Sequence, residues 1–214
     1  MRLGIMGGTF DPIHYGHLFI AEEARVHFRL NSVQFIPNGS PPHKPDRAIT
    51  SATHRFAMSL IATGPNPAFG CSAIELNRPG PSYTVDTLDF VRREYPTAEL
   101  FTITGVDAIA ELLTWKRHEE VVEKTKFIVA TRPGFDLQIL KERLPRAYLE
   151  KILLVGSTEL GISSTDIRTR MQQGLSIRYL TPDGVVEYIS KHRLYRAAEP
   201  PAADELPQPA ATGR

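Results

Sequence analysis

The chain has 214 residues, of which 42% are hydrophobic and 23% charged, and its formal net charge is +1. These values are typical of a globular protein with a substantial core, and they exclude a general attraction to nucleic acid or to an anionic membrane. The single cysteine, Cys71, excludes an internal disulfide and fits a reducing compartment. The N-terminus lacks the apolar core of a signal peptide and no apolar run reaches membrane-spanning length, so we expect a cytoplasmic protein.

Short apolar runs bounded by glycine or proline predict six buried strands. In chain order they are 3–6, 33–36, 69–76, 100–104, 127–130 and 152–155. Helical spacing of apolar residues predicts a helix opening at Asp11-Pro12, followed by helices over 53–62, 84–95, 108–113, 137–144, 163–173 and 183–191. The alternation of strands and helices predicts an α/β fold with a doubly wound, mostly parallel sheet and a small C-terminal helical part.

Particular apolar residues are expected to face the core. On the first helix they are Leu18, Ala21, Ala24 and Phe28; on 53–62 they are Phe56, Leu60 and Ile61; on 84–95 they are Val85, Leu88 and Val91. We expect one domain over residues 1–196. The Ala/Pro-rich segment 197–214 has little to bury and is expected to be a disordered tail outside that domain.

The stretch 7–17, GGTFDPIHYGH, joins the first predicted strand to the first predicted helix. Gly7 and Gly8 allow a sharp turn and a close approach of the backbone to a ligand, and a helix N-terminus attracts phosphate. His14 and His17 are three residues apart, so both rings can point the same way and donate hydrogen bonds to phosphate oxygens. A turn with two solvated histidines, or a metal site without an evident third ligand, is the alternative.

A second candidate is the segment 161–168, GISSTDIR. Ser163 or Ser164 can cap a helix whose first-turn N–H groups form a positive end. Arg168 lies close enough to that turn to reach the same anion with its planar guanidinium group. On its own, this segment is better explained as an ordinary capped helix, and its value as a binding site depends on its occurrence together with the first stretch. In a doubly wound sheet both segments would meet ligands at the carboxyl ends of the strands.

Together the two motifs resemble the paired signature of the HxGH nucleotidyltransferases. Further stretches are similar to one branch of that superfamily, the bacterial nicotinate-nucleotide adenylyltransferases, and the resemblance spans residues 1 to 196. They are PNGSPPHK (37–44), HRFAM (54–58), PGPSYTVDTL (79–88), GVDAIAELLTW (105–115), TRPG (131–134) and YLTPDGVVEYISKHRLY (179–195).

The resemblance implies a reaction in NAD biosynthesis, in which ATP and nicotinate mononucleotide give nicotinate adenine dinucleotide and pyrophosphate. The acceptor's phosphate would attack the α-phosphorus of ATP directly, without a covalent enzyme intermediate. Catalysis would then consist of alignment and charge stabilisation, for which His14, His17 and Arg168 are suited. Mg²⁺ is expected to be held mainly by the ATP phosphates, with no metal site in the protein.

The resemblance also assigns two sets of binding residues. ATP is expected to contact Gly7, Gly8, Thr9, Phe10, His14, His17, Gly105, Asp107, Ile162, Ser163, Ser164, Thr165 and Arg168. The nicotinate nucleotide is expected to contact Asn38, His43, Lys44, Tyr83, Thr84, Trp115 and Arg132. By residue type alone Trp115 would more readily belong to the core, but its place in the motif suggests stacking on the pyridine ring.

Other functions stay open at this point. A sister adenylyltransferase would act on nicotinamide mononucleotide or phosphopantetheine, and a non-catalytic nucleotide sensor would keep the fold without turnover. A class I aminoacyl-tRNA synthetase uses a similar HxGH turn, but the chain lacks the length and basic surface for a tRNA-binding domain. The expected partners are therefore small molecules, and the sequence leaves open whether the chain forms a homo-oligomer.

Overall fold

The computed structural model describes residues 1–39, 49–131, 138–156 and 160–196. Six strands form one sheet in the order β3-β2-β1-β4-β5-β6, and each neighbouring pair is parallel. The strands are β1 (Arg2–Gly8), β2 (Ser32–Pro37), β3 (Phe69–Cys71), β4 (Glu99–Gly105), β5 (Lys126–Thr131) and β6 (Ile152–Gly156). The predicted doubly wound α/β fold is confirmed, with β3 shorter than the predicted strand 69–76.

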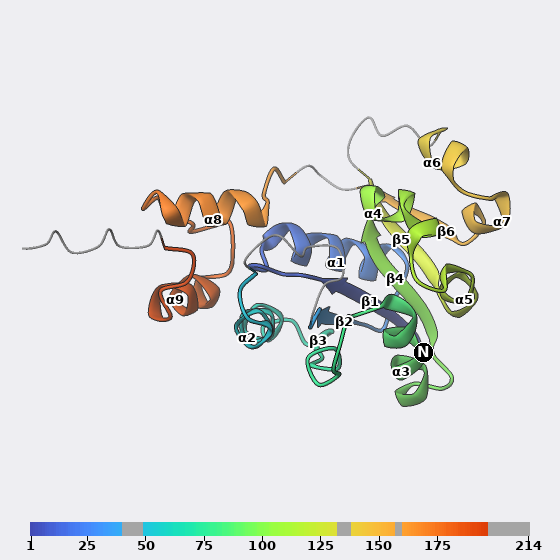
Figure 1. The fold of residues 1–214 in the computed structure, drawn as a ribbon, viewed down its shortest axis with the longest axis horizontal. Coiled ribbons are helices and arrows are strands. Elements are labelled where there is room, and N and C mark those ends of the chain that lie inside the picture. Colours follow the sequence, from blue (N-terminus) through green and yellow to red (C-terminus); the bar gives the residue numbers. More distant parts are fainter. Residues whose placement is uncertain (40–48, 132–137, 157–159, 197–214) are drawn as a thin grey trace, which may run out of the picture.

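Helices cover both faces of this sheet (Figure 1). They are α1 (Tyr15–His27), α2 (Ala52–Thr63), α3 (Thr84–Glu94), α4 (Val106–Ala110), the 3₁₀ helix η1 (Leu112–Thr114), α5 (His118–Lys124), α6 (Gln138–Arg143), α7 (Arg146–Leu149), α8 (Ser164–Gln172) and α9 (Asp183–Lys191). The short helices α5 and α7 were not predicted, because neither is long enough to show a clear helical period. Within the described ranges, no helix is long and apolar enough to cross a membrane.

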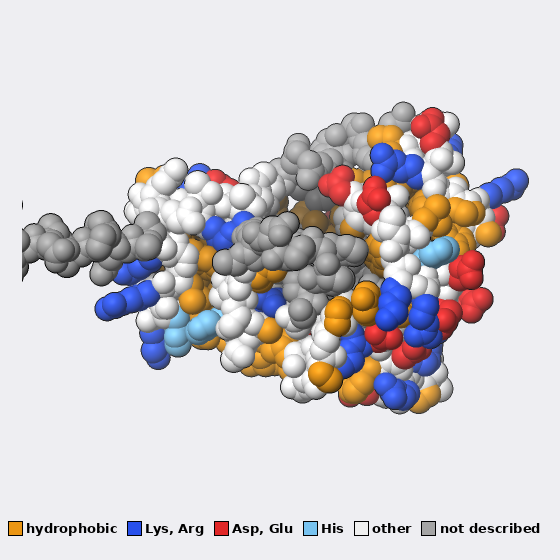
Figure 2. Space-filling model, in the orientation of Figure 1, with side chains coloured by type: hydrophobic (Ala, Val, Ile, Leu, Met, Phe, Trp, Pro, Cys, Tyr) orange, Lys and Arg blue, Asp and Glu red, His pale blue; other side chains and the backbone are white. Residues whose placement is uncertain are grey.

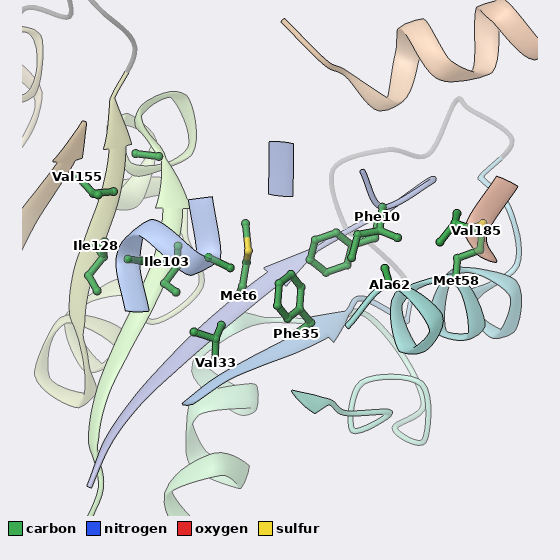
Figure 3. Packing of buried hydrophobic residues seen from close by; sticks show 14 of the residues in the cluster. Met6, Phe10, Val33, Phe35, Met58, Ala62, Ile103, Ile128, Val155 and Val185 are labelled. Atoms are coloured by element: carbon green, nitrogen blue, oxygen red, sulfur yellow. The ribbon is translucent and has the colours of Figure 1, made fainter. Parts of the chain in front are cut away.

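Two hydrophobic clusters hold the helices to the sheet. Alternate residues of each strand point to opposite faces, so Met6 belongs to the cluster under α1, α2 and α9, whereas Ile5 belongs to the cluster under α3, α4 and α5. In the first cluster Phe10 and Phe35 pack between the sheet and α2, and Met58 of α2 lies beside Val185 of α9 (Figure 3). The C-terminal helical part therefore shares the core of the sheet.

The start of the first helix differs from the prediction. Asp11-Pro12 does not open α1; its peptide bond is cis, and the helix begins at Tyr15 after His14 as N-cap. The backbone carbonyls of Asp11, Pro12 and Ile13 accept hydrogen bonds from distant side chains instead of from a helical turn. Residues 9–14 therefore form an ordered turn between β1 and α1, which we call the β1–α1 turn.

The buried face of α2 was also predicted incorrectly. Leu60 and Ile61 are 51% and 36% exposed, whereas Arg55 is only 1% exposed. Arg55 Nη1 donates to the carbonyl of Thr9 at 2.7 Å, and Nη2 donates to the carbonyl of Asn38 at 2.7 Å. These bonds turn the Arg55 side of α2 toward the loops after β1 and β2. The predicted inward residues of α3, in contrast, are confirmed as buried.

The described surface mixes charges of both signs. Arg117, for example, lies within ion-pair distance of Asp86, Asp89 and Glu120 on α3 and α5. Figure 2 shows the same alternation of basic and acidic side chains over this part of the molecule. This distribution agrees with the net charge near zero and does not resemble a nucleic-acid-binding face.

Candidate active site

Two cavities open at the carboxyl ends of β1 and β4, one on each face of the sheet. The α1 cavity, about 340 Å³, is lined by Met6, Gly7, His14, Gly16, His17, Phe19, Ile20, Ile103, Thr104, Gly105, Val106, Asp107, Ala130, Thr131, Leu160 and Ile162. The α3 cavity, about 250 Å³, is lined by Ile5, Gly7, Gly8, Thr9, Asn38, Glu75, Ser82, Thr84, Thr87, Leu88, Thr102, Ile103, Thr104, Ala108 and Trp115. Gly7, Ile103 and Thr104 line both, so the two cavities meet at the centre of the sheet edge.

Glycine leaves the backbone accessible at this edge. A Cβ atom built on Gly7 or on Gly105 would meet no other atom within 4 Å, so open space lies directly over both residues. A ligand in the α1 cavity can therefore approach the ends of β1 and β4 closely.

The two histidines of the motif are held together at the start of α1. Their rings are stacked, with centroids 3.7 Å apart and planes 29° apart. The backbone N–H of His14 donates to Nδ1 of His17 at 3.3 Å, so Nδ1 is unprotonated and the proton of the neutral ring lies on Nε2. Phe10 packs edge-on against the His17 ring with centroids 5.0 Å apart. His17 is thus oriented as an Nε2–H donor.

Burial keeps both rings neutral. It lowers the pKa of His14 to about 4, and it lowers the pKa of His17 well below 6.5, with a further contribution from the neighbouring His14. Nδ1 of His14 is buried and has no hydrogen-bond partner among the described residues. Both neutral rings line the α1 cavity, where an N–H donor such as Nε2–H of His17 is suited to binding an anion.

The β1–α1 turn is fixed by the C-terminal part of the chain. Nη1 of Arg168 donates to the carbonyl of Asp11 at 2.7 Å, and the hydroxyl of Ser164 donates to the carbonyl of Pro12 at 2.8 Å. The hydroxyl of Thr181 donates to the carbonyl of Ile13, also at 2.8 Å. These contacts place the N-terminus of α8 against the motif GGTFDPIHYGH, as the pairing of the two motifs predicted.

Asp11 and Tyr195 add a side-chain contact to this arrangement. The Tyr195 hydroxyl donates to Oδ1 of Asp11 at 2.7 Å. Burial, together with this hydrogen bond, raises the pKa of Tyr195 far above its ordinary value. The tyrosine is therefore protonated at neutral pH and donates to the turn.

The α3 cavity lies beside the N-terminus of α3. Tyr83 is the N-cap residue and makes no side-chain capping bond, and Thr84 begins the helix at the cavity wall. Trp115 lines the same cavity and packs edge-on against Phe127. Nζ of Lys116 lies 4.1 Å from the centroid of the Tyr83 ring. Aromatic and hydroxyl groups near a helix N-terminus are suited to a flat ring that carries a carboxylate.

Several predicted residues have a structural role in the described geometry. Phe10 is buried, so only its backbone can reach a ligand. Asn38 accepts from Arg55 through its side-chain oxygen and its carbonyl, although it also lines the α3 cavity. Ser163 accepts from the N–H of Asp166, and Thr165 accepts from Arg168. Of the predicted segment 162–168, only Ile162 lines the α1 cavity.

The remaining predicted residues fall into two groups. Gly7, Gly8, Thr9, His14, His17, Gly105, Asp107, Thr84 and Trp115 line one or both cavities. His43, Lys44 and Arg132 lie outside the described residues, as does the predicted tail 197–214.

Sequence reasoning missed residues that support or line the cavities. Glu75, Ser82 and Thr87 line the α3 cavity without belonging to any predicted set. Thr181 and Tyr195 stabilise the β1–α1 turn. A useful signal for a residue such as Glu75 would have been an acidic side chain in an otherwise apolar run, since such a group is buried only with partners.

The sequence of this chain is similar to a family model and to proteins of known description. Residues 5–170 match the family model described as cytidylyltransferase-like. A probable nicotinate-nucleotide adenylyltransferase of Moorella thermoacetica is 52% identical, covering 91% of this chain and 92% of that protein. A protein of Leifsonia xyli with the same description is 49% identical and covers 92% of this chain and 94% of its own length.

Solved structures agree on the fold. The nicotinic acid mononucleotide adenylyltransferase of Plasmodium falciparum, complexed with NaAD, aligns with a TM-score of 0.71 and covers 91% of this chain and 97% of its own. Its sequence is 21% identical, so this likeness concerns the fold alone.

Neutral, buried His14 predicts a loss of stability in acid. Its folded-state pKa of about 4 lies below the unfolded value of 6.5, so the unfolded chain gains a proton that the folded chain resists. The contribution of His14 to the free energy of unfolding is fully present above pH 6.5. It falls as the pH drops toward 4, by up to about 3 kcal/mol. Denaturant unfolding of wild type and His14→Asn across this range measures the effect, and the variant should show the shallower pH dependence.

The exposed His27, on the same helix, supplies the control. His27→Asn should leave the pH dependence of the unfolding free energy unchanged. An equally steep pH dependence in wild type and His14→Asn would contradict the burial of a neutral imidazole at position 14.

Proposed function

The chain belongs to the nicotinate-nucleotide adenylyltransferases, within the cytidylyltransferase-like family, and we propose that it transfers the adenylyl group of ATP to nicotinate mononucleotide. The products are nicotinate adenine dinucleotide, a precursor in NAD biosynthesis, and pyrophosphate. The observation that carries this proposal is identity near 50% over more than nine-tenths of both chains. The two cavities with a common wall agree with it, because the reaction must bring together two nucleotides.

The α1 cavity is the proposed ATP site. The donor Nε2–H of His17 and the open backbone at Gly7 are compatible with phosphate groups at the start of α1, where His14 also lines the cavity. Asp107 lines the other end of this cavity and is exposed, so its carboxylate is suited to accepting hydrogen bonds from ribose hydroxyls. Arg168 is placed beside the turn, where its charge can stabilise the leaving phosphates.

The α3 cavity is the proposed site of the acceptor nucleotide. The first two N–H groups of α3, those of Thr84 and Val85, precede the bonds to the Tyr83 carbonyl, which begin at Asp86, and Tyr83 supplies no side-chain cap. These N–H groups can donate to the nicotinate carboxylate, while Trp115 offers an aromatic surface for the pyridine ring. His43, Lys44 and Arg132 remain candidate cations for the acceptor's phosphate on the basis of the sequence resemblance.

The two cavities suggest direct transfer. A phosphate oxygen of nicotinate mononucleotide forms a bond to the α-phosphorus of ATP, and the bond from that phosphorus to the oxygen bridging to the β-phosphate breaks. Pyrophosphate leaves with the electron pair of that bond. No protein nucleophile is required, and burial raises the pKa of the Cys71 thiol to about 12, so it stays protonated and unreactive. The protein's contribution is alignment and charge stabilisation, with His17 donating to a phosphate oxygen.

The proposed metal is Mg²⁺ that enters with ATP. Among the described residues, no group of three or more histidine, cysteine, aspartate or glutamate side chains is arranged to hold a metal ion. This donor set fits a cation coordinated mainly by phosphate oxygens and water, which would neutralise charge on the triphosphate.

His17→Asn is expected to lower kcat by two to three orders of magnitude, about the cost of losing one oxyanion donor. The asparagine oxygen can replace Nδ1 as acceptor of the His14 N–H, so the turn is retained while the Nε2–H donor is lost. Steady-state pyrophosphate release measures the effect, with His27→Asn as the matched control. A change of less than threefold would remove His17 from the mechanism.

A coupled pyrophosphate assay with several acceptors tests the function itself. We expect kcat/KM for nicotinate mononucleotide to exceed that for nicotinamide mononucleotide by about 10- to 100-fold, because an amide would place a donor against the N–H groups of α3. Phosphopantetheine, which has no pyridine ring, should give no pyrophosphate. ATP binding without pyrophosphate release for any pyridine mononucleotide would establish a nucleotide sensor and contradict the enzymatic function.

A further inference from the structure

One buried acidic residue in the α3 cavity has no part in the chemistry described so far. Glu75 follows β3, is 8% exposed, and is the charged residue among the described residues that line this cavity. Burial raises the pKa of Glu75, while hydrogen bonds from Thr87 and Ser82 lower it. A carboxyl group is costly to bury, and its retention beside a site for an anionic substrate needs a physical reason.

The Glu75 carboxyl group connects three segments of the cavity wall. The hydroxyl of Thr87, in the first turns of α3, donates to Oε1 of Glu75 at 2.5 Å. The Ser82 hydroxyl, just before α3, and the backbone of Gly39, after β2, both act on the carboxyl group by lowering its pKa. Gly39 N–H donates to the Ser82 hydroxyl at 3.1 Å as well. The loop after β2, the segment after β3 and the start of α3 thus meet around the Glu75 carboxyl group.

The fit between these segments is close. A Cβ atom built on Gly39 would overlap the backbone carbonyl of Glu75, so only glycine fits at this position of the loop after β2. Thr87 is buried, and its hydroxyl oxygen also lies 3.2 Å from the carbonyl oxygen of Tyr83, the N-cap residue of α3. Through Thr87, the position of Glu75 is therefore linked to the position of the helix N-terminus.

Other roles for Glu75 fit less well. A phosphate acceptor is already ionised at neutral pH and needs no general base, and a single carboxylate does not make a metal site. The carboxyl group accepts the hydrogen bond from Thr87, which leaves a structural connection as its evident function.

We propose that Glu75 is a positioning residue, which fixes the N-terminus of α3 so that its free N–H groups meet the carboxylate of the acceptor nucleotide. This proposal rests on the proposed function, in which the carboxylate of the acceptor nucleotide binds at the N-terminus of α3. Under this proposal Thr87 and Glu75 act as one unit, because each needs the hydrogen bond to the other in order to fix the N-terminus of α3. Neither residue lines the α1 cavity on the other face of the sheet.

Kinetics with both substrates test the proposal. Thr87→Val removes the hydroxyl and preserves the side-chain volume, and Glu75→Ala removes the acceptor. Each should raise KM for nicotinate mononucleotide at least fivefold and leave KM for ATP within twofold. The double variant should be no worse than the more affected single variant, because the two residues act together. Thr63→Val, which removes a buried hydroxyl bonded within α2, is the matched control and should change neither KM.

Three outcomes would overturn the proposal. They are unchanged KM values in both variants, parallel increases in both KM values, or additive effects in the double variant. Glu75→Gln separates positioning from charge: if Glu75 only repelled the substrate carboxylate, this variant would lower KM for nicotinate mononucleotide, and that result would also overturn it.

Hydrogen exchange tests the positioning role of Glu75 without requiring turnover, so its result is separate from the test of the proposed function. Amide protons in the first two turns of α3 should exchange at least tenfold faster in Thr87→Val than in wild type, whereas those of α1 should not change. If wild-type protein showed no turnover with nicotinate mononucleotide, the proposed function would fail, and unchanged exchange in α3 would separately overturn the positioning role.

Discussion

Three consecutive backbone carbonyls in the β1–α1 turn accept hydrogen bonds from side chains more than 150 residues away in the sequence. Asp11 is bound by Arg168, Pro12 by Ser164, and Ile13 by Thr181. A buried carbonyl without a hydrogen-bond partner costs roughly 1–3 kcal/mol of folding free energy, so these contacts contribute strongly to fixing the turn. The histidine pair begins directly after this turn, and its orientation depends on where the turn is held.

This constraint explains why the C-terminal helices belong to the same core as the sheet. Val185 of α9 packs beside Met58 of α2, and α2 carries Arg55, which holds the carbonyls of Thr9 and Asn38 (Figure 3). The loops after β1 and β2 are thereby tied to the same helices that support the turn. The two cavities then lie on opposite faces of one rigid sheet edge, with Gly7 between them. A reaction between two bound nucleotides needs this fixed relation of one site to the other.

Much of this architecture could be predicted from local patterns. Apolar runs ended by glycine or proline located the strands, and Val85, Leu88 and Val91 gave the buried face of α3, because burial of an alternating or helical stripe leaves a periodic signal. The motif around His14 and His17 and the residues at Trp115 and Thr84 indicated the two cavities through their resemblance to a known family. Their roles in binding remain proposals.

Long-range polar contacts could not be predicted in this way. Arg55, Glu75 and Thr181 each bond to groups far away in the sequence, and a single polar side chain leaves no period by which its partner can be found. The same limit accounts for the error in α2, where the bonds of Arg55 turn Leu60 and Ile61 toward the surface. The polar contacts that shape both cavities are therefore visible only in the folded structure.

The dependence of the proposed ATP site on the C-terminal part of the chain is tested most directly by ATP binding to Thr181→Val. Thr181 is fully buried and lines neither cavity, so its hydroxyl can affect ATP only through the carbonyl of Ile13. We expect the Kd for ATP to rise by about five- to tenfold or more, since one lost buried hydrogen bond costs roughly 1–3 kcal/mol. The control Thr63→Val should lose a comparable amount of stability to Thr181→Val and leave the Kd for ATP unchanged. A Kd for Thr181→Val within twofold of wild type would contradict the account.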